Sequence, residues 1–296
     1  MQKKLLKAKK FCQIKMYVKD KLFCGAKKIG KKVQLLTNTS KDDEISIDNL
    51  IAQKIPLEKV SKFVYYYKDG IVYEGDYKNG KPEGKGKLYF NYGDIYLGDF
   101  KDGKGHGKGE TYFESGTIYL GDYKNGQKDG NGIFYFSDGN TYKGGFKKDI
   151  MEGSGIYYYA DGSRFEGDFI YNNMSKGIYY INNGDIFEGY FNDGEMSRGI
   201  YYYKNGDIFE GEFKYGIKEG HGIYYFSNGS RYKGNFKNDN PEGIGVKNYI
   251  NGDIYSGNFK NGRPEGVGVM HYNNGKIIKG YFQANPSNNN QIVLLI

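Results

Sequence analysis

A repeat of 22 or 23 residues constrains this chain more than any other feature of its sequence. The segment YEGDYKNGKPEGKG, residues 73–86, returns as YLGDFKDGKGHGKG, YLGDYKNGQKDGNG, FEGEFKYGIKEGHG and YSGNFKNGRPEGVG. Nine complete repeats begin at Tyr73, Tyr96, Tyr119, Tyr142, Phe165, Phe187, Phe209, Tyr232 and Tyr255. A partial repeat begins at Ile278, and residues 63–70 match the second half of another. Self-similarity at this period indicates stacked copies of one supersecondary element over residues 63–282.

Each repeat has the pattern of a β-hairpin. In the first repeat Tyr73, Gly75 and Tyr77 alternate with acidic residues, so they share one face of a strand. Gly86 and Leu88 share the corresponding face of a second strand, and Asp-Gly and Asn-Gly pairs supply tight turns. Glycines between aromatic residues leave bare backbone over which a neighbouring ring can lie. Because one hairpin alone is marginally stable, the hairpins must stack.

The composition favours strands and turns over helices, since 17% of the residues are aromatic, with 32 Tyr, and 46 are Gly. We therefore expect an all-β protein, a single-layer antiparallel sheet of about nine to ten stacked hairpins. The repeats that begin at Phe165 and Phe187 have 22 residues. We place their missing residue in the loop, because a deletion within a strand would reverse its faces.

The pattern Tyr-x-Gly-x-Phe, then Gly-x-Gly, then aromatic-x-Asp-Gly at 23 residues resembles the MORN (membrane occupation and recognition nexus) repeat family. The resemblance covers about three quarters of the chain and implies an elongated, twisted sheet that is used mostly as a scaffold. Members of the family include radial-spoke-head components of cilia, junctional membrane proteins and cell-division scaffolds of parasites. This chain departs from the family pattern in having no Trp; Tyr or Phe stands at the usual Trp/Phe position.

The face opposite the glycines carries a second regular pattern. In seven successive repeats the central residue of the second strand is a tyrosine, namely Tyr89, Tyr112, Tyr135, Tyr158, Tyr180, Tyr202 and Tyr225. Two residues earlier, five of these repeats have an isoleucine, namely Ile133, Ile156, Ile178, Ile200 and Ile223. We call these residues the Tyr/Ile ladder. Two interpretations stay open: a partner-binding face, because exposed apolar surface rich in tyrosine is typical of interfaces, or residues present for their β propensity alone.

A second candidate surface is a group of apolar residues that the pattern assigns to consecutive loops. Its members are Ile150, Met151, Met174 and Met196. Loops of successive hairpins align on one edge of a sheet, and flexible methionines suit adaptable binding. Drift of loop sequence explains the same residues equally well.

Catalytic and metal-binding patterns are weak. Carboxylates recur two residues apart on first strands, as in Glu74 and Asp76, but a solvated face beside lysines explains them best. His106, His221 and His271 are scattered and have no partners at metal-ligand spacing. We expect no enzyme, no cofactor and no metal site. Outside residues 1–32 the chain is nearly neutral, which argues against a nucleic-acid partner.

The first 32 residues form a basic tail, with twelve Lys and one acidic residue. The tail begins with Lys3, Lys4, Lys7, Lys9 and Lys10. An amphipathic helix over its apolar stripe would suit an anionic membrane, an acidic cytoskeletal surface or targeting, and a solvated extension is the alternative. Its two cysteines, Cys12 and Cys24, form no CxxC pair, which favours a reducing compartment.

The sequence thus divides into a basic tail (1–39), a short helix and linker that cap the array (40–62), the repeat array (63–282) and a C-terminal linker with an apolar tail (283–296). The apolar tail either folds back onto the last strand or adds a strand to a partner. We expect a non-enzymatic scaffold whose partners are other proteins, with self-association as a further option. The resemblance implies a cytoplasmic setting in a cytoskeletal or ciliary assembly. The alternative is a peripheral membrane tether that binds anionic phospholipid through the tail, and mitochondrial import is a minor option.

Overall fold

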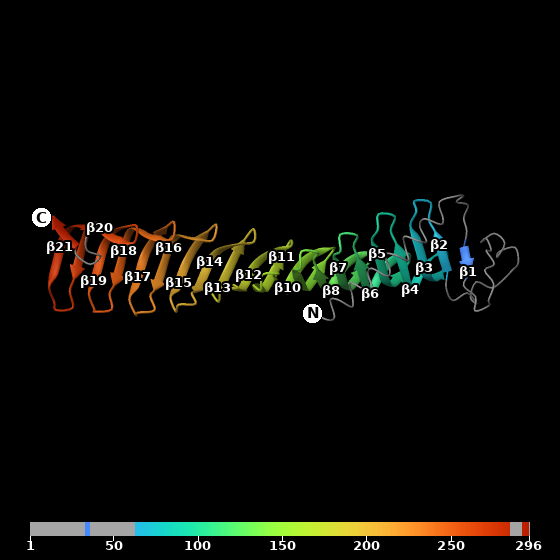
Figure 1. Ribbon diagram of the computed structural model, residues 1–296, viewed down its shortest axis with the longest axis horizontal. Helices are drawn as coiled ribbons and strands as arrows, with labels where there is room; N and C mark the ends of the chain where they lie inside the picture. The colour runs from blue at the N-terminus through green and yellow to red at the C-terminus, as the bar shows by residue number, and fades with distance from the viewer. Residues whose placement is uncertain (1–32, 36–62, 285–291, 296) are drawn as a thin grey trace. The chain divides into compact units, whose positions relative to one another are not determined.

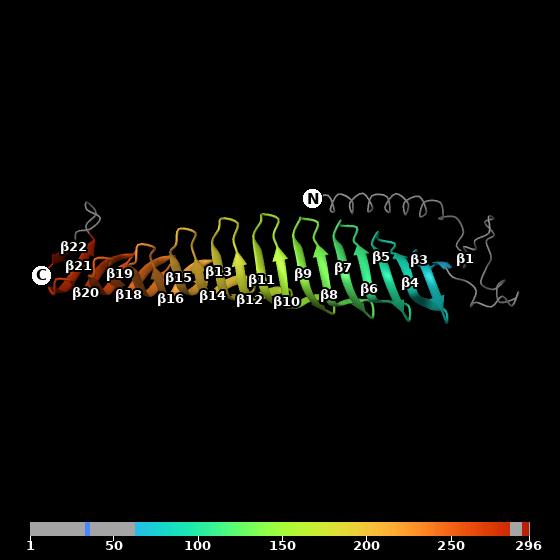
Figure 2. The same cartoon turned by 90° about the horizontal axis from the view of Figure 1, so that it is seen from below.

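The computed structural model describes residues 33–35, 63–284 and 292–295 (Figures 1 and 2). These ranges contain 22 strands and no helix. The chain divides into two compact units, Met1–Ile150 and Met151–Ile296. Among the described residues, no helix exists that is long and apolar enough to cross a membrane.

Unit 1 is an open antiparallel sheet in which each strand pairs with the next along the chain. Its strands are β1 (Val33–Leu35), β2 (Phe63–Tyr66), β3 (Val72–Lys78), β4 (Lys81–Tyr89), β5 (Ile95–Lys101), β6 (Lys104–Tyr112), β7 (Ile118–Lys124), β8 (Gln127–Tyr135) and β9 (Thr141–Lys147).

The strands of unit 2 are likewise antiparallel, and each pairs with the next along the chain. It begins within β10 (Ile150–Tyr158). The remaining strands are β11 (Arg164–Ile170), β12 (Asn173–Tyr180), β13 (Ile186–Asn192), β14 (Glu195–Tyr202), β15 (Ile208–Lys214), β16 (Ile217–Tyr225), β17 (Arg231–Lys237), β18 (Asn240–Asn248), β19 (Ile254–Lys260), β20 (Arg263–His271), β21 (Ile277–Ala284) and β22 (Ile292–Leu295).

Tight turns with left-handed backbone join the two strands of each hairpin. Between β13 and β14, Asp193 and Gly194 have φ values of 49° and 81°, and other hairpins place Asn-Gly at the same positions. These residue types adopt positive φ at low cost, and two such residues in succession give a turn whose twist matches that of the flanking strands.

The core of each unit lies on one face of its sheet, which we call the ring face. The aromatic residue that starts each repeat is the first ring, and the aromatic four residues later is the second ring. Phe187 is 0% exposed and meets the second ring of its own strand, Phe191, and that of the next repeat, Phe213, edge to face at 5.2 and 5.3 Å. Such pairs contribute about 1 kcal/mol each beyond the area they bury.

The register confirms the predicted assignment of faces. Tyr179 pairs with the first rings Phe165 and Phe187, whereas Tyr180 pairs with Arg164 and therefore points to the opposite face. We call that opposite face the open face, because no second layer of the described residues packs on it (Figure 2).

The prediction that the 22-residue repeats lose a loop residue is wrong. In a 23-residue repeat such as β15–β16, the paired residues change from Gly211–Gly222 to Phe213–Lys218. This step advances two residues along β15 but four residues along β16, so β16 bulges. In the 22-residue repeat of β11 and β12, two positions oppose one. The missing residue therefore comes from the β-bulge in the second strand, and the faces are kept because the bulge absorbs the change.

The ends of the array are covered by short strands. β1 pairs with β2, at the place where the truncated first repeat lacks its own first strand. At the other end β22 pairs with β21, so the apolar tail does fold back onto the last strand of the array. Within the predicted basic tail only Val33–Leu35 are described, as β1; residues 1–32, including Lys3, Lys4, Lys7, Lys9 and Lys10, and the predicted helix within 40–62 lie outside the described residues.

Candidate functional site

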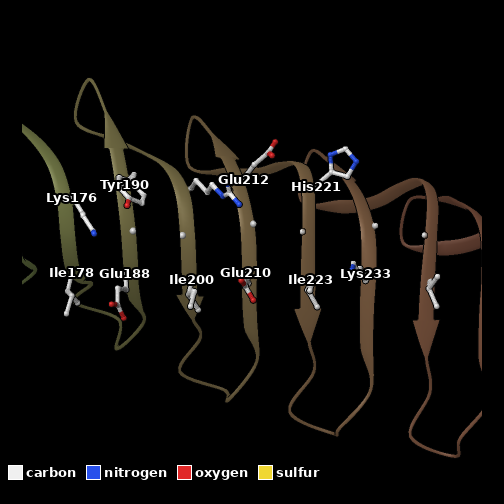
Figure 3. A pocket seen from close by; sticks show the side chains of 18 of the residues that line it. Lys176, Ile178, Glu188, Tyr190, Ile200, Glu210, Glu212, His221, Ile223 and Lys233 are labelled. Carbon is white, nitrogen blue, oxygen red and sulfur yellow. The ribbon is translucent and has the colours of Figure 1, made fainter.

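A groove of about 950 Å³ runs along the open face of unit 2, across strands β12 to β18 (Figure 3). Two rows of side chains form its walls, and glycine backbone forms its floor. Because side chains point alternately to the two faces of a strand, each wall takes every second residue. The two walls therefore lie on either side of the glycines.

The floor is flat because glycines pair directly across strands, as in Gly189–Gly199. A Cβ added to Gly189 would point to the ring face and lie 2.7 Å from Phe187 Cζ and 2.7 Å from the Cα of Gly199. The rings therefore fill the space on the other side of the floor. The same glycines allow the rings to pack against the backbone on the ring face and leave bare backbone in the groove on the open face.

The first wall alternates isoleucine with charged residues. Its members are Ile178, Glu188, Ile200, Glu210, Ile223, Lys233 and Val246. Glu188 and Glu210 are exposed, and within the described ranges neither carboxylate makes an ion pair or a hydrogen bond. The half-buried Ile200 lies between their strands on the same face, so the wall presents two unpaired anions beside an apolar side chain.

The second wall is mostly polar. Its members are Lys176, Tyr190, Arg198, Glu212, His221 and Ile244. Tyr190 is 53% exposed, and the Nζ of Lys176 lies 5.1 Å from the centre of its ring, a cation–π contact. Arg198 pairs in register with both Tyr190 and Glu212. This wall offers hydrogen-bond donors and an exposed aromatic face.

The shortened bulges explain the open surface at Tyr190. In three of the seven 23-residue repeats the equivalent residue is an aspartate that binds the bulge, as where Asp122 Oδ2 accepts a hydrogen bond from Asn131 N at 2.9 Å. Burial opposes ionisation there, but the bonds from Lys108 and Asn131 outweigh it and lower the pKa of Asp122. Tyr190 has no carboxylate that could accept hydrogen bonds from the bulge, and the bulge in its partner strand β14 is shorter.

The structure places the Tyr/Ile ladder on the open face, where the sequence predicted it. Ile178, Ile200 and Ile223 belong to the first wall of the groove. The tyrosines form the adjacent row and differ in exposure: Tyr158, Tyr202 and Tyr225 are 42%, 36% and 37% exposed, whereas Tyr112 is buried and donates a hydrogen bond to Glu110. The guanidinium of Arg164 lies 4.1 Å above the ring of Tyr180. Partner binding by the ladder stays a prediction.

The remaining ladder residues occupy the same face in their own hairpins. Tyr89 and Tyr135 pair with Ile95 and Thr141, and Ile133 and Ile156 pair with Lys143 and Glu166. Tyr89 also donates a 3.4 Å hydrogen bond to Glu74.

The prediction that Ile150, Met151, Met174 and Met196 lie in loops is wrong. All four are strand residues of β10, β12 and β14. Met174 pairs with Phe169 and Met196 with Phe191, so these two side chains lie on the ring face and are half-buried. The hydroxyl of Tyr159 also contacts the sulfur of Met174 at 3.6 Å. Two-residue turns make the hairpins tighter than the sequence suggested, so the strands begin earlier.

The groove and its second wall were missed from the sequence. Two signals were available: Tyr190 replaces an acidic residue, and it does so within a block of 22-residue spacing. His221 lies in this wall and not in any metal cluster; among the described residues, no three His, Cys, Asp or Glu side chains gather to hold a metal ion.

A family model described as MORN repeat matches this chain over eight segments, which together cover more than half of it. They are 73–94, 96–118, 119–141, 142–164, 187–208, 209–231, 232–254 and 255–277. The segment between residues 164 and 187 is not matched, although β11 and β12 form the same hairpin there. A comparison with curated proteins finds no match.

Among solved structures, the chain is similar to the TCP10 domain of Danio rerio CPAP, with 12% identity and a TM-score of 0.39 over 74% of this chain and 99% of that one. The same domain in complex with a peptide of Danio rerio STIL gives 14% identity and a TM-score of 0.32, over 79% and 92%.

Proposed function

Since this chain belongs to the MORN repeat family, we propose that it is a non-enzymatic scaffold that binds other proteins through the open face of unit 2. The observation that carries the proposal is the recurrence of exposed apolar and aromatic side chains on this face, among them Tyr158, Tyr190, Tyr202, Tyr225 and Val246. Surfaces of this kind are costly to leave in water and are typical of interfaces. MORN repeats fit this role of a protein-interaction scaffold.

Two features of the structure support binding over catalysis. The groove is long and shallow, and its glycine floor leaves backbone accessible to an extended ligand. Its charged side chains alternate with isoleucines along one wall, which suits recognition of a repeated chemical pattern.

The test is paired affinity purification from native cell extract followed by mass spectrometry. One bait is the wild-type protein, and the other carries Tyr158→Ser, Tyr202→Ser and Tyr225→Ser, three ladder residues that are partly exposed. We expect specific proteins to be lost with the variant, while circular dichroism shows an unchanged sheet. Each substitution removes a cross-strand contact that contributes about 0.2–1 kcal/mol, so the fold should survive.

A matched control removes tyrosines from unit 2 without touching the open face. Tyr171 and Tyr215 lie on hairpin turns and are 74% and 73% exposed. The variant Tyr171→Ser/Tyr215→Ser should retain every partner. If both variants retain the same partners, the open face is not the binding surface and the proposal fails.

We also propose that the assembly belongs to the cytoskeleton or the cilium, because the repeat family includes such scaffolds. Fluorescence of a tagged chain at axonemes or other cytoskeletal structures would support this setting, and a diffuse or mitochondrial signal would contradict it.

The membrane-tether alternative depends on the basic tail, whose charge favours anionic lipid. It requires salt-sensitive binding to vesicles with anionic phospholipid that is lost when residues 1–32 are removed. Under the scaffold proposal, the partners that depend on Tyr202 and Tyr225 are retained after the same deletion.

A further inference from the structure

The two walls of the groove repeat with the spacing of one hairpin. Neighbouring strands of a sheet lie about 4.8 Å apart, so equivalent side chains of successive hairpins lie about 9.6 Å apart. Along the first wall this spacing separates Ile178 from Ile200 and Ile200 from Ile223. It also separates Glu188 from Glu210. The row of glutamates is offset from the row of isoleucines by one strand.

A ligand lying along the groove must present equivalent side chains at the same interval. A polyproline II helix has three residues per turn and rises about 3.1 Å per residue, so its side chains return to one direction every 9.3 Å or so. A β-strand returns to one face after about 6.6 Å, and an α-helix does so after each turn, at about 5.4 Å and about 10.8 Å. Of these three conformations, polyproline II comes closest to the spacing of the hairpins.

The width of the groove also favours a slender ligand. Its walls are two residues apart along each strand, about 6.7 Å. An α-helix with its side chains is about 10 Å across and would rest on top of both walls. A polyproline II segment has a thinner backbone, and it has no internal hydrogen bonds, so its carbonyl groups are free to accept bonds from the wall.

The chemistry of the two walls specifies the side chains of the ligand. Glu188 and Glu210 lack partners among the described residues, and each calls for a cation on the ligand. The ring of Tyr190 remains 53% exposed beside its contact with Lys176 and suits a proline, since proline-rich segments dock on aromatic surfaces. Arg198, in the same wall as Tyr190, is exposed and can donate to ligand carbonyls.

We propose that this groove binds a polyproline II segment of a partner protein that carries Lys or Arg at every third residue, with successive cations on Glu188 and Glu210. The inference rests on the proposed scaffold function and names the class of partner for its binding face. Apolar residues at the remaining positions contact Ile178, Ile200 and the glycine floor.

The test is calorimetric titration of the full-length chain with a blocked peptide of sequence PPKPPKPPKPPK. Two comparison peptides isolate spacing and charge: PKKPPPPPPKKP has the same composition without the three-residue period, and PPEPPEPPEPPE reverses the charge. We expect the regular lysine peptide to bind about tenfold more tightly than the shuffled one, because only its cations reach both carboxylates at once. The glutamate peptide should not bind.

Matched variants of the protein assign the binding to the groove. The change Glu188→Gln with Glu210→Gln should weaken binding of the regular peptide about tenfold. The control, Asp193→Asn with Glu195→Gln, also removes two negative charges, one from the turn between β13 and β14 and one from the first residue of β14, both outside the groove, and should leave binding unchanged. Both variants change exposed residues, so both should keep the circular dichroism spectrum of the wild type.

Three results would overturn the inference. Equal affinity for the regular and shuffled peptides would exclude recognition of the three-residue period. Equal losses of peptide affinity in the two protein variants would show that binding depends only on the net charge of the protein. If no peptide binds but the variant with Ser at positions 158, 202 and 225 still loses partners in the affinity purification, the inference fails while the scaffold proposal stands. If that variant loses no partners, the scaffold proposal itself fails.

Discussion

Replacement of Gly189 by alanine tests whether the close contact between glycine backbone and rings holds the sheet together. The new Cβ would lie 2.7 Å from Phe187 Cζ and 2.7 Å from Gly199 Cα, whereas carbon atoms in ordinary contact are about 3.5–4.0 Å apart. The ring can shift slightly, but Gly199 Cα belongs to the backbone of the paired strand. Overpacking of this kind costs about 1–3 kcal/mol, and the backbone contact places the expected loss near 3 kcal/mol.

The matched control is Gly194→Asn in the turn of the same hairpin. Gly194 has a φ of 81° and no atom within 4 Å of an added Cβ, and Asn172 holds the same turn position in the preceding hairpin with a φ of 70°. Asparagine tolerates this conformation, so the expected cost is below about 0.5 kcal/mol.

Urea denaturation gives the free energies of unfolding, and hydrogen exchange of β13 and β14 measures the local effect. Because the chain is a repeat protein, it can unfold in several steps, and the urea transition alone would then not give the stability of this hairpin. Hydrogen exchange measures that local stability directly. If Gly189→Ala costs no more than Gly194→Asn, the glycines do not seat the rings and the account of the core is wrong.

Three further predictions concern the rings and the buried polar groups. Phe187→Ala should lower the free energy of unfolding by about 3–5 kcal/mol in urea, because the ring is fully buried. Burial raises the pKa of Tyr142 to about 12. Its contribution to stability is therefore present below pH 10 and is lost as the pH rises toward 12. Tyr142→Phe should make the urea midpoint fall less steeply over that pH range. Burial opposes ionisation of Asp207, but hydrogen bonds from Ser227 N and the Tyr224 hydroxyl, both 2.7 Å, outweigh it and lower its pKa. Its contribution is present above a carboxyl's usual pKa of about 4 and is lost as the pH falls further, so Asp207→Asn should reduce the acid sensitivity of the urea midpoint.

The repeat period and its internal alternation were enough to predict the hairpins and their two faces. Phe187 and Gly189 lie two residues apart, so a common face followed from strand geometry alone, and the register confirms it. The same rule correctly placed Tyr180 on the opposite face. These features depend on neighbours within one strand or one hairpin, which is the range over which sequence patterns are informative.

The bulges could not be located from the sequence, and the errors follow from them. A bulge is a mismatch between two strands, so its size appears only when both partners are in register. The pairing of Met174 with Phe169 could therefore not be predicted, and neither could the exposed surface beside Tyr190. The strand β1 was missed because three residues, Val33–Leu35, carry too little pattern to be recognised.

The ring contacts also bear on how such a chain changes length. The first ring of one repeat touches the second ring of the next, as in Phe165 with Phe191 and Phe209 with Phe236. The same junction can therefore form between any two adjacent copies. Duplication or loss of one whole hairpin would preserve the junctions, whereas an insertion of a few residues within a strand would break them. Duplication of one hairpin would thus lengthen the groove, and loss of one hairpin would shorten it, without a change in the core contacts.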